Sequence, residues 1–159
     1  MFLKPDYNIK SIYEINLEEL KAKGINALLF DLDSTLMESK TAYYSEETLN
    51  WLGKVKQDFF VGIVSNNSDK TYIERVKAVT NCPIVFKAGK PRIKVAKTFM
   101  DNHNLKGETT AFVGDRPLTD TLCGKRLGCI TILVDSISAE KEKPIVRFVR
   151  KLERLTVKQ

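Results

Sequence analysis

Histidine and cysteine are scarce in this chain, and their scarcity excludes several kinds of site. His103 is the only histidine, so it has no partner with which to form a transition-metal site, and it lies in a polar stretch typical of the surface. The three cysteines, Cys82, Cys123 and Cys129, are an odd number with no close pair at metal-ligand spacing. We therefore expect reduced, structural cysteines rather than a zinc site or a disulfide framework.

Long apolar runs and low-complexity tracts are also missing. The apolar runs have the length of strands, and the first residues, MFLKPDYNIK, lack the apolar core of a secretory signal. The chain has 159 residues, of which 43% are hydrophobic and 29% charged, and this is typical of one globular domain. The sequence therefore predicts a single domain over residues 1–159 that stays in the cytoplasm.

The charge of the chain is unbalanced, because 26 basic residues outnumber 20 acidic ones and give a formal net charge of +6. This favours an anionic partner without choosing among nucleic acid, lipid headgroups and acidic proteins. Aromatic residues are not interleaved with the basic clusters, so no nucleic-acid interface is expected. No GxxxxGK[ST] run is present, and this excludes a P-loop nucleotide site.

Five short apolar runs recur along the chain, with helix-like segments between them. The runs are too continuous for alternating strands with one wet face, and they are typical of parallel strands covered on both faces. They are INALLFDL from residue 25, FFVGIVSN from 59, PIVF from 83, TAFVGD from 110 and CITILVDS from 129, and the helical segments begin at 45, 67, 91 and 118. The alternation predicts an α/β fold with a three-layer, doubly wound, Rossmann-like parallel sheet.

Residue types at the expected helix boundaries agree with this assignment. Ser45 precedes two glutamates, Pro91 suits a first helical position, and Gly128 suits the position after a helix end. One more short helix is expected from Asn16, because its spacing to Glu19 is that of a capping box.

The segment EKEKPIVRFVRKLERL, from residue 140, predicts a basic amphipathic helix. Its apolar residues Ile145, Val149 and Leu152 share one helical face. Its basic residues lie elsewhere on the helix: Arg147, Arg150, Lys151 and Arg154. The favoured interpretation is a terminal helix docked on the sheet layer with a solvated basic face, and the alternative is a helix that binds a membrane surface or a partner.

Polar residues follow the expected strands, at the edge where ligands of an open α/β sheet bind. Each could be an ordinary turn, cap or solvated residue, and only their combination indicates a site. They are Asp31 and Asp33 after the first run, Ser65, Asn66 and Asn67 after the second, Lys90 after the third, and Asp115 and Asp120 after the fourth.

Several carboxylates at one edge predict a bound cation. Two carboxylates about 4 Å apart repel by roughly 4 kcal/mol at an effective dielectric constant of about 20, so three or four of them in one cleft require a counter-ion. All candidate ligands are oxygens, which favours Mg²⁺ over Zn²⁺. With a lysine, a serine and helix amino termini nearby, such a site suits a phosphoryl group.

Asp31 and Asp33, two residues apart, suggest the chemistry. One aspartate can attack phosphorus and form an acyl phosphate. The second can protonate the leaving alcohol and then deprotonate the water that hydrolyses the intermediate. This mechanism requires the first carboxylate in the cleft and a sharp turn of the chain directly after it.

The same residues resemble the four motifs of the haloacid dehalogenase (HAD) superfamily of phosphatases. Motif I is FDLDSTL, although the family more often has Asn where Ser34 stands; motif II is IVSNN, motif III is Lys90-Pro91 and motif IV is GDRPLTD. The opening FLKPDYNIKSIYEI and the stretch GDRPLTDTLCGKRLG further resemble the YqeG branch of subclass IIIA. That branch is related to the phosphatidylglycerophosphate phosphatases of mitochondria and plants.

The resemblance implies a role for each motif residue. Asp31 would be the nucleophile and a metal ligand, and Asp33 would be the acid/base and bind the metal through its backbone carbonyl. Lys90 would neutralise charge on the transferred group. Asp115 would complete the metal shell, with Asp120 beside it, through water or by fixing Lys90. Substrate contacts would come from Ser65, which would bond the phosphoryl oxygens, and from Asn66 and Thr35.

No insertion of the kind that serves as a lid in other HAD branches is present, since only about ten residues separate Thr35 from the next expected helix. We therefore expect no cap domain and an open cleft, which favours a phosphorylated lipid headgroup, protein or nucleic-acid end over a small metabolite. The leading substrate is phosphatidylglycerophosphate, with a peripheral contact to the inner face of an anionic membrane. The alternatives are a soluble phosphatase for a nucleotide, sugar phosphate or phosphoprotein, a phospho-accepting domain and a scaffold.

Overall fold

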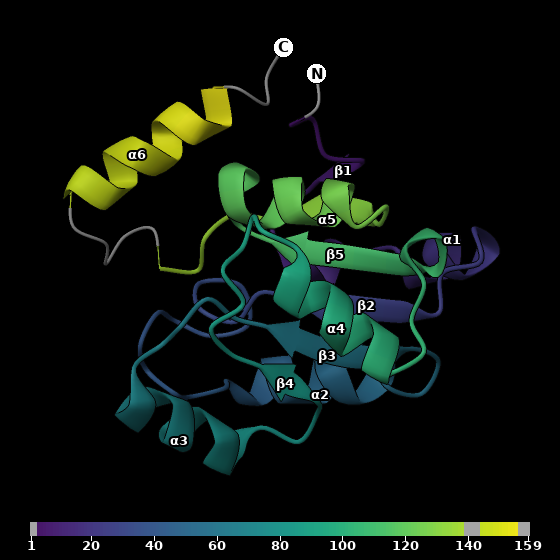
Figure 1. Cartoon of the computed structure of the whole chain (residues 1–159), viewed down its shortest axis with the longest axis horizontal. Coiled ribbons are helices and arrows are strands. Elements are labelled where there is room, and N and C mark those ends of the chain that lie inside the picture. The colour runs from purple at the N-terminus through teal and green to yellow at the C-terminus, as the bar shows by residue number, and fades with distance from the viewer. Residues whose placement is uncertain (1–2, 139–143, 156–159) are drawn as a thin grey trace.

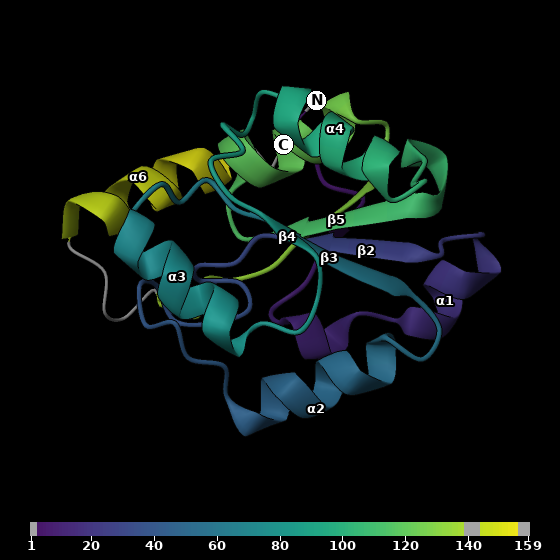
Figure 2. The same ribbon diagram turned by 60° about the horizontal axis from the view of Figure 1, so that its bottom comes forward.

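Six parallel strands form one sheet, with helices on both of its faces (Figures 1 and 2). The computed structural model describes residues 3–138 and 144–155. The strand order is β1-β6-β5-β2-β3-β4, and all neighbouring strands are parallel. The strands are β1 (Tyr7–Asn8), β2 (Ala27–Phe30), β3 (Phe60–Val64), β4 (Ile84–Val85), β5 (Thr110–Gly114) and β6 (Ile130–Leu133).

The helices make the two outer layers. Helices α1, α2 and α3 cover one face of the sheet, and α4 and α5 cover the other, as the two views show (Figures 1 and 2). The helices are α1 (Leu17–Ala22), α2 (Glu46–Val55), α3 (Lys70–Val79), α4 (Lys94–Asn102), α5 (Leu122–Arg126) and α6 (Pro144–Leu155). Short helical turns are η1 (Ile12–Glu14), η2 (Gly107–Thr109) and the π-helical η3 (Pro117–Thr121).

Neighbouring residues of the central strand serve opposite faces. Leu28 and Phe30 of β2 pack into the core under α1 to α3, whereas Leu29 packs into the core under α4 and α5. Both faces of β2 are thus buried, which explains its unbroken apolar sequence. The predicted three-layer, doubly wound parallel sheet is confirmed.

Five strands coincide with the five apolar runs, but β1 was not expected. Tyr7 and Asn8 pair with Ile132 and Leu133 of β6 at the edge of the sheet. Two residues are too short to show a hydrophobic pattern, so tertiary pairing alone reveals this strand.

The predicted helix caps are present. The Ser45 side chain accepts a hydrogen bond from the Thr48 backbone at 3.1 Å, and the Asn16 side chain accepts one from Glu19 at 3.0 Å. Gly128, after α5, has a φ of 77°, which a glycine adopts without strain. The prediction for Pro91 is wrong, because the chain first closes a turn in which the Arg92 N–H bonds Gly89, and α4 begins only at Lys94.

The cysteines are unpaired, in line with the sequence. Cys123 and Cys129 are buried, and burial raises the pKa of each thiol to about 12. Thiols that keep their protons are poor nucleophiles, so these residues contribute packing rather than chemistry.

The favoured prediction for α6, a terminal helix docked on the sheet layer with a solvated basic face, is wrong. Its apolar side chains are exposed, and polar contacts from Glu153 and Arg154 join the helix to the domain instead. The exposed apolar residues are Ile145, Phe148, Val149, Leu152 and Leu155. Within the described ranges, no helix combines the length and the apolar character that crossing a membrane requires.

The topology fixes where a site belongs. From the central β2 the chain proceeds to β3 and β4 on one side, and it then crosses to β5 and β6 on the other. The connections therefore diverge at the carboxyl ends of β2 and β5, where open α/β sheets bind their ligands.

Candidate active site

A polar cavity of about 280 Å³ lies at the carboxyl ends of β2, β3 and β5. All but one of the site residues predicted from sequence line it, and Thr35 lies beneath them. The lining residues are Asp31, Asp33, Ser34, Ser39, Ser65, Asn66, Asn67, Lys90, Asp115, Arg116, Thr119 and Asp120. Segments far apart in the sequence thus meet at the edge that the sequence indicated.

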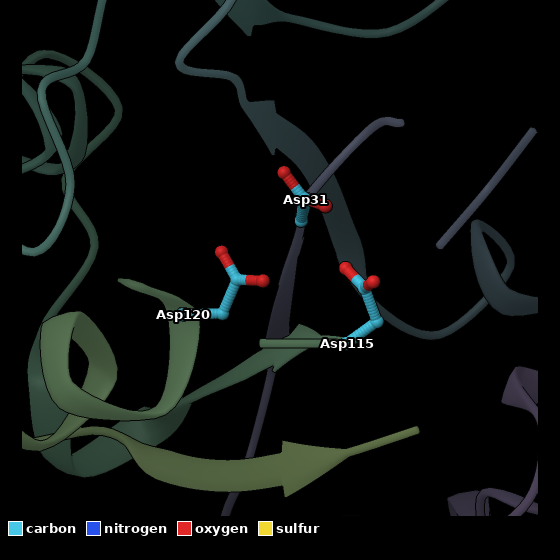
Figure 3. A group of neighbouring side chains, drawn as sticks. All are labelled: Asp31, Asp115 and Asp120. Atoms are coloured by element: carbon cyan, nitrogen blue, oxygen red, sulfur yellow. The ribbon is translucent and has the colours of Figure 1, made fainter. Parts of the chain in front are cut away.

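Three carboxylates from different elements point toward one another (Figure 3). Asp31 follows β2, Asp115 follows β5, and Asp120 belongs to η3. One oxygen of each lies within 4.8 Å of the others. Asp115 and Asp120 are each only 2% exposed, so water screens their repulsion poorly. Such a group of oxygen ligands suits a divalent cation.

Lys90 reaches into the same group. Its Nζ lies 2.9 Å from Asp31 Oδ1 and 2.8 Å from Asp120 Oδ1. Burial disfavours the charged ammonium, but the Asp120 and Asp31 carboxylates outweigh burial and raise the pKa of Lys90. The lysine therefore carries a positive charge at neutral pH.

The pKa of Asp120 lies above that of an ordinary aspartate. Burial first, and the neighbouring Asp31 carboxylate second, raise the pKa of Asp120 to about 6, although Lys90 and the Arg116 backbone N–H act in the opposite direction. A proton on Asp120 therefore competes with a cation near neutral pH.

Close packing against the backbone holds Asp120 in place. A Cβ at Gly114 would lie 2.4 Å from the Cβ and Cγ of Asp120, so only glycine fits at the end of β5. The Asp120 carboxylate also accepts a hydrogen bond from the Arg116 N–H at 3.2 Å. The π-helical turn η3 thus brings Asp120 back over the strand that carries Asp115.

Thr35 bridges two of the carboxylates. Its hydroxyl lies 3.2 Å from both Asp31 Oδ2 and Asp115 Oδ1, and the residue is 1% exposed. The resemblance implied a contact with substrate, whereas the contacts in the structure are with the carboxylates. Thr35 therefore positions Asp31 and Asp115.

The Asp33 side chain lies apart from the three carboxylates. Its Oδ1 accepts hydrogen bonds from the Lys40 N–H at 3.0 Å and from the Tyr72 hydroxyl at 2.5 Å. Its Oδ2 lies 3.5 Å from Asn67 Nδ2. These contacts hold the second carboxylate of the pair in the cavity wall without placing it among the three others.

The chain turns sharply after Asp33, two residues beyond Asp31, after which the proposed chemistry expects the turn. Ser34 has a φ of 71°, and its N–H donates to the Met37 carbonyl at 2.7 Å. This left-handed conformation is one that Asn adopts more readily than most residues, which gives a physical reason for the asparagine more often found at this position of motif I.

The Asn66 side chain forms two hydrogen bonds with the backbone of Lys90. Its Oδ1 accepts from the Lys90 N–H at 2.8 Å, and its Nδ2 donates to the Lys90 carbonyl at 3.0 Å. Ser65 lies beside it, 1% exposed, and its hydroxyl accepts from the Asn67 N–H at 3.1 Å. Both residues line the cavity as expected, and Asn66 in addition fixes the position of the lysine.

Sequence reasoning missed several residues of the site. Arg116 and Thr119 lie inside motif IV, so their position in the motif was an available signal. Ser39 lines the cavity from the loop after motif I. Tyr72 gave no signal, because a tyrosine in the first turn of a helix looks like any other core residue.

Known proteins resemble this chain over most of its length. The family model described as "Mitochondrial PGP phosphatase" matches residues 1–138. The "Probable phosphatase YqeG" of Bacillus subtilis (strain 168) is 36% identical over 157 residues, which cover 96% of this chain and 88% of the relative. "Phosphatidylglycerophosphate phosphatase 1, chloroplastic/mitochondrial" of Arabidopsis thaliana is 28% identical over 168 residues, covering 99% of this chain but only 48% of the plant protein.

Solved structures share the fold. A HAD-like family hydrolase from Porphyromonas gingivalis superposes with a TM-score of 0.58 at 14% identity, over 81% of this chain and 98% of the other. A protein from Listeria monocytogenes serotype 4b gives 0.56 at 19% identity, over 69% and 78% of the two chains. The family model and the bacterial relative establish that the chain belongs to the mitochondrial PGP phosphatase family and is a phosphatase, and the solved structures show that it has the fold of a HAD-like hydrolase.

Proposed function

We propose that this protein is a Mg²⁺-dependent phosphatase that forms an acyl phosphate on Asp31 and acts on phosphatidylglycerophosphate. The proposal takes residues 1–159 as one catalytic domain. Its main support is the position of Asp31, whose side chain is 15% exposed, against 3% for that of Asp120. Asp31 is thus the more accessible of these two carboxylates and lines the cavity as a nucleophile must.

In the first step, a carboxylate oxygen of Asp31 attacks phosphorus. A bond forms between Asp31 and phosphorus while the bond from phosphorus to the substrate alcohol breaks. Asp33 gives its proton to the departing alcohol oxygen. The ammonium of Lys90 neutralises charge on the phosphoryl oxygens, and Ser65 donates a hydrogen bond to one of them.

In the second step, water replaces Asp31 on phosphorus. Asp33, now ionised, takes a proton from the water as its oxygen bonds to phosphorus, and the bond to Asp31 breaks. Inorganic phosphate leaves, and both aspartates return to their starting states. The separation of Asp33 from the carboxylate group supports this assignment, because it leaves that side chain available for proton transfer.

Asp31, Asp115 and Asp120 are the side chains that would hold Mg²⁺, with the Asp33 backbone carbonyl as a further ligand. Their oxygens fit a hard cation, since no histidine or cysteine belongs to the group. Bound Mg²⁺ would supply charge neutralisation for the transferred phosphoryl group. Asp120 would act in part through Lys90, which it contacts directly.

A lipid substrate is supported by the name of the plant relative and by the family description. In the described part of the chain, residues 38–45 form no helix or strand between motif I and α2, so no cap covers the cavity from this connection. The proposal therefore places the protein in the cytoplasm, working on lipid headgroups at the inner face of an anionic membrane.

The test is phosphate release with and without Mg²⁺ from an aryl phosphate, nucleotides, a phosphopeptide and phosphatidylglycerophosphate in micelles. We expect the lipid to be the fastest substrate and Asp31→Asn to lose activity by at least about 10³-fold. Acid quenching with ³²P-labelled substrate would detect the phosphorylated protein, and Asp31→Asn would remain unlabelled.

Asp58→Asn is the matched control, because Asp58 is an exposed aspartate at the opposite edge of the sheet. It should keep wild-type rates and labelling. Faster hydrolysis of a nucleotide or phosphopeptide than of the lipid would contradict the substrate, and labelling of Asp31→Asn would contradict the nucleophile.

A further inference from the structure

We propose that α6 is an in-plane membrane helix, which lays its exposed apolar face on an anionic bilayer and brings the active site to the headgroups. This inference rests on the proposed function, whose substrate is a membrane lipid, and it identifies the surface that meets the membrane. Three observations on the described residues support it: the exposure of the apolar face of α6, the polar contacts that tether the helix to the domain, and the charge of the helix.

The apolar face of α6 is open to solvent. Spacings of three and four residues place its members on one side of the helix. Their exposed fractions are 65% for Ile145, 57% for Phe148, 39% for Val149, 47% for Leu152 and 52% for Leu155. A stripe of large apolar side chains beside polar ones is typical of a helix that lies in the membrane interface.

Two polar residues near the end of α6, Glu153 and Arg154, hold the helix to the domain. Arg116 pairs with Glu153 through two hydrogen bonds, of 3.2 Å from Nε and 2.8 Å from an Nη nitrogen. Arg154 donates to the Asp115 carbonyl at 3.2 Å and pairs with Asp135 at 3.3 Å. At 100° per residue, Arg154 lies opposite the apolar stripe and Glu153 lies at its border, four residues after Val149. The exposed fractions show that the stripe itself points away from the domain.

The tether also places the helix beside the cavity. Asp115 and Arg116 are lining residues, and both views show α6 beyond the carboxyl ends of the strands (Figures 1 and 2). Two more exposed apolar side chains adjoin the same cavity. Leu118, 41% exposed, precedes the lining residue Thr119, and Ile137, 47% exposed, bonds to Ser34 through its backbone.

The positive charge of α6 favours an anionic bilayer over a second copy of the chain as the binding partner of this face. The sequence of α6 contains four basic residues, Arg147, Arg150, Lys151 and Arg154, against the single acidic Glu153. Arg116 offsets Glu153 and Asp135 offsets Arg154, which leaves the other three basic residues of the sequence to set the charge of the helix. The whole chain has a net charge of +6. A second copy would bring the same positive charges together, whereas anionic headgroups attract them.

The test is co-sedimentation with phosphatidylcholine vesicles that contain or lack phosphatidylglycerol. We expect the wild-type protein to sediment with the anionic vesicles and to be released by high salt. Phe148→Ser combined with Leu152→Ser should bind about tenfold more weakly, because two large apolar side chains no longer enter the interface. The control pair is Leu49→Ser with Val79→Ser, which are similarly exposed on α2 and α3 and should bind like wild type.

Charge is tested with a second matched pair. Lys151→Glu in α6 should weaken binding to the anionic vesicles, whereas Lys54→Glu in α2 makes the same change in net charge and should not. Circular dichroism and thermal unfolding check that each variant folds. Equal binding by the α6 and control variants would overturn the proposal.

Failure of this inference is distinct from failure of the proposed function. A wild-type protein that hydrolyses the aryl phosphate but ignores anionic vesicles would overturn the membrane surface alone. A protein that binds the vesicles through α6 but hydrolyses no ester would overturn the phosphatase mechanism alone. Size-exclusion chromatography that shows a dimer broken by the α6 pair, without vesicle binding, would assign the face to a second copy and also overturn the proposal.

Discussion

Among the single residues of the site, Tyr72 has a hydroxyl that directly contacts the proposed acid/base, Asp33. It donates to Asp33 Oδ1 at 2.5 Å, from a helix that contributes nothing else to the motifs. Burial first, and the Asp33 carboxylate next, raise the pKa of Tyr72, so the hydroxyl keeps its proton and remains a donor. Tyr72 is thus a positioning residue for the proposed acid/base.

Tyr72→Phe should lower kcat by about tenfold, because a hydrogen bond to the Asp33 side chain is lost and Asp33 becomes less well oriented. Steady-state kinetics with an aryl phosphate would measure this, and KM should change little. Tyr44→Phe is the matched control, since Tyr44 is a buried tyrosine whose hydroxyl meets Thr80 at 2.8 Å instead. Equal effects of the two substitutions would show that Tyr72 acts only through stability.

Single residues also show what the sequence could reveal about the site. Asp31 and Asp115 directly follow buried strands, and Lys90 lies in the loop after β4, so their convergence was predictable from strand topology. Tyr72 meets Asp33 only because α3 packs beside the turn after β2, and no local pattern encodes that contact. The contacts of Thr35 with two carboxylates were hidden for the same reason.

Among the elements, the junction of β5 with η3 determines how closely the acidic residues approach. Gly114 ends the strand, and Asp120 returns over it with no room for another atom. Gly114→Ala should displace Asp120 and with it Lys90, so that kcat falls by at least about tenfold. Phosphate release would measure the loss, and Mg²⁺ titration would show weaker binding.

Gly53→Ala provides the control for this prediction. A Cβ at Gly53 would have no neighbour within 4 Å, and the residue lies within α2. Alanine there should leave activity unchanged and stabilise the fold by about 0.5 to 1 kcal/mol, because alanine favours a helix over glycine. A Gly114→Ala variant as active as Gly53→Ala would contradict the packing argument.

The helices and strands differed in how well the sequence predicted them. The buried strands and the capped helices were predictable because apolar runs, caps and glycines carry local signals. The short edge strand β1 and the start of α4 depended on pairing and turn geometry that no single run encodes. For α6 the amphipathic pattern was read correctly, but amphipathicity does not say whether its apolar face meets the sheet or the surroundings.

Mg²⁺ binding should stabilise the whole molecule in a pH-dependent way. Because burial raises the pKa of Asp120 to about 6, protonation of Asp120 should displace the cation as the pH falls through about 6. In the metal-free protein the same shift acts in the opposite direction, since a raised carboxyl pKa favours the folded state at low pH and not at high pH. The increase in Tm on adding Mg²⁺ should therefore be largest above about pH 7 and small at about pH 5.

Asp120→Asn should reduce this stabilisation by Mg²⁺ and flatten its pH dependence over that range. Asp101→Asn is the control, because Asp101 forms an exposed ion pair with Lys97 on α4, far from the carboxylate group. Thermal unfolding with Mg²⁺ or with a chelator measures both variants. A wild-type Tm increase that stays constant from about pH 8 to about pH 5 would contradict a competing proton on Asp120.

All six strands run in the same direction, so their carboxyl ends, which carry the cavity, lie at one end of the sheet and their amino ends lie at the other. The connection from α2 to β3, in which Lys56, Gln57 and Asp58 are exposed, lies at the amino ends of the strands. A fluorophore or surface linker attached there would leave the cavity and α6 untouched. The enzyme could thus be immobilised on a sensor chip in one orientation, with its catalytic edge presented to vesicles in the flow.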